Sequence, residues 1–206
     1  MYSYTWDPET GGILLNSAPL QFSREPRPVF SRELDILGFN RHWKYDSDDS
    51  APYMWAEANN YFYRGKLVAQ VKGGTFFTAP TIVLIEDPEP DNGKLTPVDV
   101  DKMLMKNQQI LESLTLDTIK RVYNTYQFKN KVDIFHVSYS GGKDSEVALD
   151  IVQRAIPHND FIVVFGDTGM EFPDTYESVN LAKEKCEQNG IDFLIARSHM
   201  KPCESW

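Results

Sequence analysis

The segment of residues 138–145 constrains the fold of this 206-residue chain more than any other stretch. It reads Ser-Tyr-Ser-Gly-Gly-Lys-Asp-Ser, follows the largely apolar run 132–137, and precedes the amphipathic stretch 146–156. This order predicts a strand that ends, turns through two glycines and continues as a helix. Because Gly141 and Gly142 permit positive φ angles, the turn can lie directly against a bound group.

The composition of this turn is that of an anion site. The first N–H groups of a helix lack intrahelical partners, and the helix dipole is positive at that end. Lys143 adds a full positive charge, and Ser140 and Ser145 add hydroxyl donors. We therefore predict that the turn binds phosphate or pyrophosphate. A purely structural Gly-Gly turn would explain the glycines but not the lysine and the two serines around them.

Two common phosphate-binding motifs do not describe this segment. A Walker A loop has a glycine five residues before its second glycine, and Ser or Thr directly after its lysine. This chain has Val137 and Asp144 at those places. The GxGxxG dinucleotide fingerprint is absent as well, so the loop belongs to another class.

Strands and helices alternate after the loop. A strand is predicted at 161–165, whose unbroken apolar run is typical of a parallel strand covered on both faces. A helix is predicted at 173–189 and a third strand at 191–196. The first helix should bury the apolar residues at helical spacing, namely Val147, Ala148, Ile151, Val152 and Ala155. Right-handed crossovers then give an α/β fold with a doubly wound parallel sheet, which binds ligands beyond the carboxyl ends of its strands.

Two motifs at these strand ends resemble those of a known family. Residues 140–145 resemble the PP-loop, SGGxDS, of the adenine nucleotide alpha-hydrolase superfamily. Residues 167–176 resemble the segment after the second strand in phosphoadenosine phosphosulfate (PAPS) reductase-like proteins, and the small subunit of ATP sulfurylase has a related segment. The resemblance covers about residues 108–197 and implies the fold of that superfamily.

The resemblance also implies an adenine nucleotide as ligand, either ATP or an adenylyl sulfate such as PAPS. The implied reaction is attack on the α-phosphate with release of pyrophosphate, or reduction of a sulfonucleotide, so oxidoreductase and adenylyl transferase both stay open. Lys143 and Asp144 would be catalytic, and Asp144 would help to hold Mg²⁺. The implied nucleotide-binding residues are Ser138, Ser140, Gly141, Gly142, Lys143, Ser145, Asp167, Thr168 and Gly169. For Asp167, a turn and N-cap residue ahead of Pro173 is the alternative.

The chain departs from the family in its cysteines and in its ending. Sulfonucleotide reductases carry a nucleophilic cysteine on a C-terminal segment that is not present here. Cys203 is either such a group or an ordinary thiol, and one cysteine cannot build an iron–sulfur cluster, so such a cluster is not supported. Cys186 is expected in the core. The family fold has about five parallel strands and three are predicted here, so we expect the reading frame to continue past Trp206.

Residues 1–95 have a different character and predict a small, mostly antiparallel β domain. They contain a hairpin that turns at Arg64-Gly65-Lys66 and a further strand at 81–85. Their aromatic residues form either a packed core or a recognition surface; the ones concerned are Trp43, Tyr53, Trp55 and Tyr61. This domain is a candidate contact site for a protein partner or for a second copy of the chain.

The acidic, Pro- and Gly-containing stretch 87–93 sets the boundary between two domains, at 1–95 and 96–206. The second domain begins with a helical region at 98–128, with a break expected near 113–117.

The overall composition limits the classes of function. The formal net charge of −9 disfavours broad binding of nucleic acids or anionic membranes, and the N-terminus does not resemble a signal peptide. A cytoplasmic protein that acts on a small adenine nucleotide is therefore expected. The alternative function is a non-catalytic protein that senses nucleotide or binds a partner.

Overall fold

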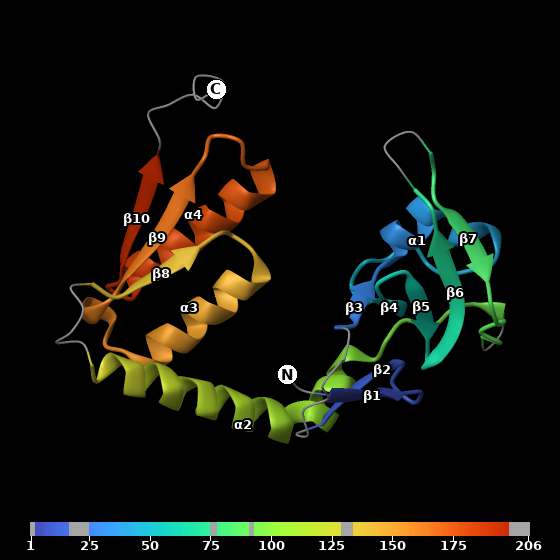
Figure 1. The fold of residues 1–206 in the computed structure, drawn as a ribbon, viewed down its shortest axis with the longest axis horizontal. Coiled ribbons are helices and arrows are strands. Elements are labelled where there is room, and N and C mark those ends of the chain that lie inside the picture. Colours follow the sequence, from blue (N-terminus) through green and yellow to red (C-terminus); the bar gives the residue numbers. More distant parts are fainter. Residues whose placement is uncertain (1–2, 17–24, 75–77, 91–92, 129–133, 198–206) are drawn as a thin grey trace. The chain divides into compact units, whose positions relative to one another are not determined.

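The computed structural model describes residues 3–16, 25–74, 78–90, 93–128 and 134–197. The chain divides into two compact units, Met1–Leu111 and Glu112–Trp206, and each is described by itself (Figure 1). The division falls inside the long helix α2 (Val100–Tyr126). The domain boundary after residue 95 stays a prediction.

The first unit is rich in antiparallel strands, as predicted. Strands β1 (Ser3–Asp7) and β2 (Gly12–Asn16) form an antiparallel pair. A second sheet has the order β3-β4-β5-β6-β7, with all neighbours antiparallel. Its strands are β3 (Arg27–Val29), β4 (Met54–Glu57), β5 (Asn60–Tyr63), β6 (Lys66–Lys72) and β7 (Thr81–Leu84). The short helices α1 (Ser31–Leu37) and η1 (Phe39–Arg41) complete the unit.

The predicted hairpin joins β5 to β6. Arg64 and Gly65 have φ angles of 48° and 86°, both left-handed. Two successive positive φ angles match the right-handed twist of the flanking strands, which is why such two-residue turns are favoured in hairpins.

The aromatic side chains of this unit form its core. Trp43, Tyr53 and Tyr61 lie together in one buried cluster, and Trp55 is buried outside that cluster. The indole Nε1 of Trp55 donates to the Gly11 carbonyl at 3.0 Å, which ties the five-stranded sheet to the turn between β1 and β2. The interpretation of these rings as packing residues is confirmed.

Helix α2 runs without interruption, so the predicted break at residues 113–117 is wrong. The segment contains neither glycine nor proline, and the hydroxyl of Thr118 donates to the Leu114 carbonyl inside the helix at 2.7 Å. Polar residues alone are too weak a signal to end a helix whose apolar positions continue. The helix has an apolar face, since half-buried positions recur at Met103, Ile110, Leu114, Ile119 and Val122.

The second unit has the predicted alternation of strands and helices. The elements are β8 (His136–Tyr139), α3 (Lys143–Ala155), η4 (His158–Asp160), β9 (Ile162–Asp167), α4 (Pro173–Gln188) and β10 (Asp192–Arg197). The three strands are parallel in the order β10-β9-β8. Strand β8 ends at Tyr139, later than the predicted end at residue 137, and residues 129–133 lie outside the described part.

Both helices of this unit pack on the same face of the sheet. One buried cluster contains strand residues from that face together with residues of α3 and α4, namely Val137, Tyr139, Val163, Phe165, Phe193, Leu149, Val179, Ala182 and Cys186. On the opposite face, Val164 is half-buried and Leu194 is 52% exposed. Coverage on both faces, predicted for β9, is therefore not seen among the described residues. What the structure shows is a mixed α/β unit with a parallel sheet.

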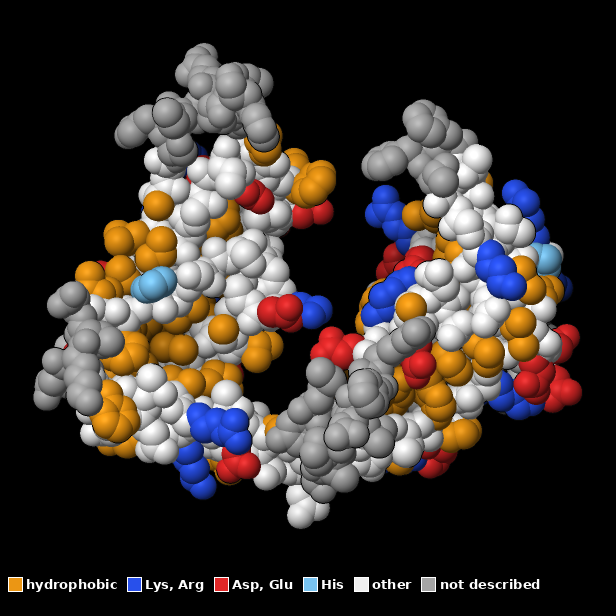
Figure 2. Space-filling view, in the orientation of Figure 1, with side chains coloured by type: hydrophobic (Ala, Val, Ile, Leu, Met, Phe, Trp, Pro, Cys, Tyr) orange, Lys and Arg blue, Asp and Glu red, His pale blue; other side chains and the backbone are white. Residues whose placement is uncertain are grey.

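The buried side of α3 differs from the prediction. Val147 is 62% exposed and Ala148 is also exposed, whereas Leu149 is buried. The helix begins at Lys143, and its spacing then turns Ser145 and Leu149 towards the sheet. Hydrophobic side chains thus reach the surface of this unit, on the left in the view of Figure 2.

Cys186 is buried in the core of the second unit, as predicted, and Cys203 lies outside the described residues. None of the helices in the described ranges has the length and apolar character needed to cross a bilayer.

Candidate functional site

The predicted phosphate loop connects β8 to α3. Gly142 is the N-cap residue of α3, with extended backbone angles of φ −95° and ψ 163°. No side-chain cap is present among the described residues at this N-terminus, so its first backbone N–H groups are not satisfied by a capping side chain. Asp144 and Glu146 lie in the first turn of the helix, next to its positive end. This end of α3 has the geometry of an anion site.

The two glycines of the loop have different roles. Gly141 has φ +76°, and a Cβ atom there would lie 3.1 Å from Thr175 Cγ2 and 3.3 Å from the Thr175 carbonyl oxygen. The loop backbone therefore packs directly on the first turn of α4. A Cβ atom on Gly142 would meet only Ser140 Oγ, at 3.6 Å, so the space over Gly142 is open. Gly141 permits packing, and Gly142 leaves room for a ligand.

The serines of the loop hold its shape. Ser145 is buried and donates its hydroxyl to the Gly142 carbonyl at 2.8 Å. Ser140 Oγ in turn donates to Ser145 Oγ at 3.3 Å. Ser138 is exposed and alternates along β8 with the buried Val137 and Tyr139, so it lies on the opposite face of the sheet. The structure thus brings together Ser140 and Ser145 but not Ser138.

Lys143 and Asp144 lie at the start of α3 and form an exposed pair. Their side chains are 88% and 90% exposed, with 2.5 Å between Lys143 Nζ and Asp144 Oδ1. An ion pair this exposed contributes little to stability, so either charge can turn to a ligand at small cost.

The same carboxylate fits a role in holding Mg²⁺. Proteins often bind this ion through one or two carboxylates together with substrate phosphates and water. The described ranges contain no group of three or more candidate ligands, so Asp144 would share the ion with the phosphates of a nucleotide.

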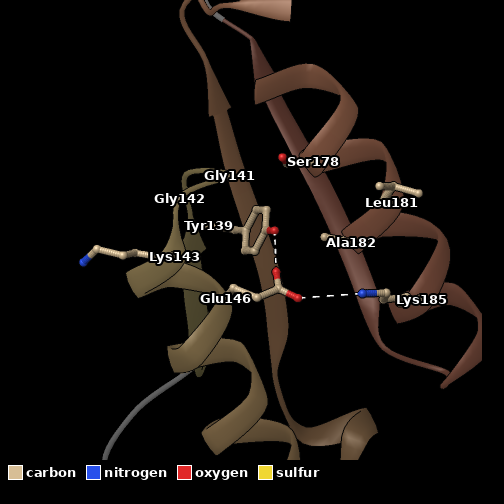
Figure 3. A pocket seen from close by; sticks show the side chains of 9 residues that line it. All are labelled: Tyr139, Gly141, Gly142, Lys143, Glu146, Ser178, Leu181, Ala182 and Lys185. Carbon is tan, nitrogen blue, oxygen red and sulfur yellow. Dashed lines mark hydrogen bonds and ion pairs between the residues drawn. The ribbon is translucent and has the colours of Figure 1, made fainter. Parts of the chain in front are cut away.

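A cleft of about 290 Å³ lies between the first turn of α3 and helix α4 (Figure 3). It is lined by Tyr139, Gly141, Gly142, Lys143, Glu146, Ser178, Leu181, Ala182 and Lys185. Glu146 accepts a hydrogen bond from Tyr139 Oη at 2.6 Å, and its other oxygen lies 3.9 Å from Lys185 Nζ. Burial and the bond to Glu146 both raise the pKa of Tyr139.

Sequence reasoning missed Tyr139, Glu146 and Lys185 as neighbours of the loop. The only local signal was the acidic residue in the first turn after the loop, and Lys185 comes from a distant helix. The cleft shares only Gly141, Gly142 and Lys143 with the predicted ligand set.

The second predicted site residue, Asp167, is enclosed at the end of β9. Its side chain is 2% exposed. Oδ1 accepts from Tyr176 Oη at 2.7 Å and from the Gly169 N–H at 2.9 Å, and Oδ2 accepts from Arg197 Nε at 2.6 Å. These donors, the Tyr176 hydroxyl first, hold the pKa of Asp167 below its usual value.

Asp167 is a turn residue but not a helix cap. The N-cap of α4 is Phe172, and no side-chain cap is present there within the described residues, so the N-cap alternative is wrong. The turn continues through Thr168, whose hydroxyl donates to Glu171 Oε1 at 2.8 Å and accepts from the Met170 N–H at 3.3 Å. Thr168 and Gly169 thus form the loop that encloses Asp167.

The strand register brings the predicted residues to one edge of the sheet. Tyr139 pairs with Phe165, and Asp167 pairs with Arg197. The loop after β8, the end of β9 and the end of β10 therefore meet at the carboxyl edge, where sheets of this class bind ligands. Arg197 was not among the predicted site residues, and its bond to Asp167 gives it a place in the site.

Comparison with known proteins agrees with this geometry. Residues 134–204 match the family model described as the phosphoadenosine phosphosulfate reductase domain. Two uncharacterized proteins of Methanocaldococcus jannaschii, MJ0973 and MJ0066, are 34% and 38% identical to this chain over 91 and 79 residues. These stretches cover 44% and 38% of this chain but only 22% and 16% of the relatives, so the chain spans a small part of their length.

The family match starts at residue 134, in the second unit, and includes both β8 with its loop and the segment after β9. This match confirms the resemblance inferred from those two motifs: residues 134–204 match the phosphoadenosine phosphosulfate reductase domain, which is consistent with a PAPS reductase-like segment of the PP-loop superfamily.

Proposed function

We propose that the second unit binds an adenine nucleotide, ATP or an adenylyl sulfate such as PAPS, with its phosphates at the start of α3. The observation that carries the proposal is the uncapped N-terminus of α3, which opens on free space above Gly142. Backbone N–H groups in that position bind phosphate oxygens, and Lys143 adds charge. The family match of the same segment supports an adenine nucleotide over other anions.

The proposed activity is enzymatic, with either adenylyl transfer or sulfonucleotide reduction as the reaction. In the first case a nucleophile bonds to the α-phosphorus, and the bond to pyrophosphate breaks with its electron pair on the leaving oxygen. Lys143 would stabilise the charge that develops on the phosphates. Mg²⁺ would neutralise phosphate charge, and Asp144 is the residue that would hold it.

The proposal includes the complete fold of the family, a doubly wound parallel sheet. It is supported by the apolar side chains of Val164 and Leu194 on the face opposite α3 and α4, because such residues are normally covered. A cytoplasmic location is part of the same proposal.

Nucleotide-dependent thermal stabilisation tests the binding. ATP or PAPS, each with and without Mg²⁺, should raise the unfolding temperature of the chain, because a ligand that binds only the folded state stabilises it. Lys143→Ala and Asp144→Ala should lose most of this shift. Lys183→Ala is the control, because Lys183 also forms a surface ion pair, with Glu187 on α4, although its side chain is less exposed than that of Lys143. Absence of a shift with every adenine nucleotide would sink the proposal.

Assays of turnover distinguish adenylyl transfer from sulfonucleotide reduction. Release of pyrophosphate from ATP supports an adenylating enzyme, whereas consumption of PAPS that depends on a thiol reductant supports a reductase. Tight binding without either reaction by the full-length protein would favour the alternative, a nucleotide sensor.

A further inference from the structure

We infer that Arg197 is a second anion-binding residue at the carboxyl edge of the sheet, and that Asp167 positions it there. The inference rests on the proposed function and adds a ligand contact to it. Neither the sequence motifs nor the family match assigned Arg197 a role.

The contrast in burial between the two partners carries the inference. The Asp167 side chain is 2% exposed, whereas that of Arg197 is 71% exposed. Asp167 Oδ2 engages only Nε of the guanidinium, at 2.6 Å. Within the described part of the chain, the two terminal nitrogens of Arg197 have no other partner, so four N–H donors face outwards.

Asp167 is itself fixed and is poorly suited to bind the ligand. Its other oxygen already accepts from Tyr176 Oη and from the Gly169 N–H. An enclosed carboxylate with three donors holds the near edge of the guanidinium in one orientation. The outer edge is then preorganised for the paired oxygens of a phosphate or sulfate group.

The place of Arg197 in the sheet indicates which ligand it suits. Arg197 ends β10, and β9 separates that strand from β8 and the PP-loop. Neighbouring strands lie about 4.8 Å apart, so the backbones of β8 and β10 are separated by roughly 10 Å. The two sites together suit a second oxyanion, either another phosphate or sulfate group of the same nucleotide or a separate sulfate or phosphate ion.

Pairs of ligands that differ by one anionic group test this assignment. Affinities of AMP and adenosine 3′,5′-bisphosphate are measured by calorimetry for the wild-type chain, Arg197→Gln and Arg197→Lys. Arg197→Gln should weaken binding of the bisphosphate by about tenfold or more and change AMP affinity little, since one charge-assisted contact is lost. Arg197→Lys should restore part of the loss. Arg154→Gln, which removes an exposed arginine paired with Asp150 on α3, is the control.

The source of the oxyanion is distinguished by competition. If the oxyanion at Arg197 is a separate ion, the affinity for free sulfate or phosphate will fall in Arg197→Gln. The added affinity from the 3′-phosphate of the bisphosphate will then not depend on Arg197. Tyr176→Phe keeps the ion pair but removes one support of Asp167, so it should weaken the bisphosphate less than Arg197→Gln does. Equal losses for AMP and the bisphosphate, together with unchanged sulfate and phosphate affinity in Arg197→Gln, would overturn the inference.

If the proposed nucleotide binding is wrong, the measured affinities will follow a different pattern. If the nucleotide site is correct, Lys143→Ala weakens the binding of AMP and of the bisphosphate by similar factors. Arg197→Gln weakens the binding of the bisphosphate alone. If the wild-type chain binds neither of these nucleotides and shows no thermal shift with ATP or PAPS, the proposed function fails. The comparison of sulfate binding by wild type and Arg197→Gln then decides whether Arg197 is an anion site.

Discussion

Tyr139 and Glu146 form a hydrogen bond that spans the PP-loop, with 2.6 Å between Tyr139 Oη and Glu146 Oε2. The bond joins the last residue of β8 to the first turn of α3. Glu146 also lies 3.9 Å from Lys185 on α4, so one carboxylate links the strand to both helices. The ends of the loop are therefore fixed by side chains and not only by its backbone.

Tyr139→Phe should lower the free energy of unfolding of the second unit by about 1 to 2 kcal/mol, because a hydrogen bond to a charged group is lost from a buried ring. Urea unfolding followed by far-ultraviolet circular dichroism measures the effect. Tyr123→Phe is the control, since Tyr123 is exposed on α2 and its hydroxyl has no hydrogen-bond partner in the described ranges. Equal stability of the two variants would contradict the role given to this bond.

The two glycines of the loop should respond differently to alanine. Gly141→Ala places a Cβ atom 3.1 Å from Thr175 Cγ2 at φ +76°, and the left-handed conformation alone costs about 1 to 2 kcal/mol. Gly142→Ala has an ordinary φ of −95° and no tight contact, so its stability should stay near that of the wild type.

The nucleotide affinity of Gly142→Ala should show whether Gly142 leaves room for a phosphate group. A methyl group in the open space above it blocks the approach of phosphate to the helix N-terminus, so Gly142→Ala should lose nucleotide affinity while remaining folded. Measurement of unfolding temperature and nucleotide affinity on both variants checks the pair. An unaffected affinity in a folded Gly142→Ala protein would argue that the ligand lies elsewhere.

The order of elements in the second unit was predictable because its signals are local. Apolar runs, the Gly-Gly turn, Pro173 at the first position of α4 and Gly190 after its end each determine structure within a few residues. The continuity of α2 was not predictable in this way, because polar residues near Ser113 weaken a helix signal without ending the helix. The buried face of α3 was predicted correctly for Ile151, Val152 and Ala155 but not for Val147 and Ala148, which are exposed in the first turns of the helix.

The candidate site could be predicted from the sequence only where its residues are consecutive in the chain. The loop residues are consecutive, so their sequence places Gly141, Gly142 and Lys143 together. The partners of Asp167 are 9 and 30 residues away, and only the parallel register of β9 and β10 brings Arg197 to it. No local pattern identifies a bond of that kind.

In the first unit, the hairpin turn should be sensitive to side-chain size. Gly65 has φ +86°, and a Cβ atom there would lie 2.8 Å from Trp6 Cβ. Gly65→Ala therefore combines backbone strain with a clash and should destabilise this unit by more than the roughly 1 to 2 kcal/mol of strain alone. Tryptophan fluorescence during urea unfolding measures the change.

Gly73 provides a matched control for this substitution. It also has a positive φ, +72°, but a Cβ atom would meet nothing within 4 Å. Gly73→Ala should show the cost of strain without the clash. If both variants lose the same stability, Trp6 does not pack on the turn as the structure indicates.

Stability of the second unit should depend on the ionisation of Asp167. Its pKa is lowered below 3.8 by the hydrogen bonds from Tyr176, Gly169 and Arg197. A carboxyl group with a lowered pKa in the folded state stabilises the fold above its unfolded-state pKa, and this contribution disappears as the pH falls through the folded-state value. Asp167→Asn should therefore be less stable than the wild type at pH 7, and the difference should shrink below about pH 4.

Urea unfolding at a series of pH values from neutral to acidic measures this difference directly. Comparison with the wild type is essential, because Asp7 in the first unit also has a lowered pKa and contributes to acid sensitivity in both proteins. Asp192→Asn is the control, since it removes an exposed carboxylate at the start of β10 in the same unit. A gap between Asp167→Asn and the wild type that stays constant into the acidic range would mean that Asp167 has the same pKa in the folded and unfolded states. The three hydrogen bonds to its carboxylate would then not favour the ionised form in the folded protein, which would contradict the role given to them.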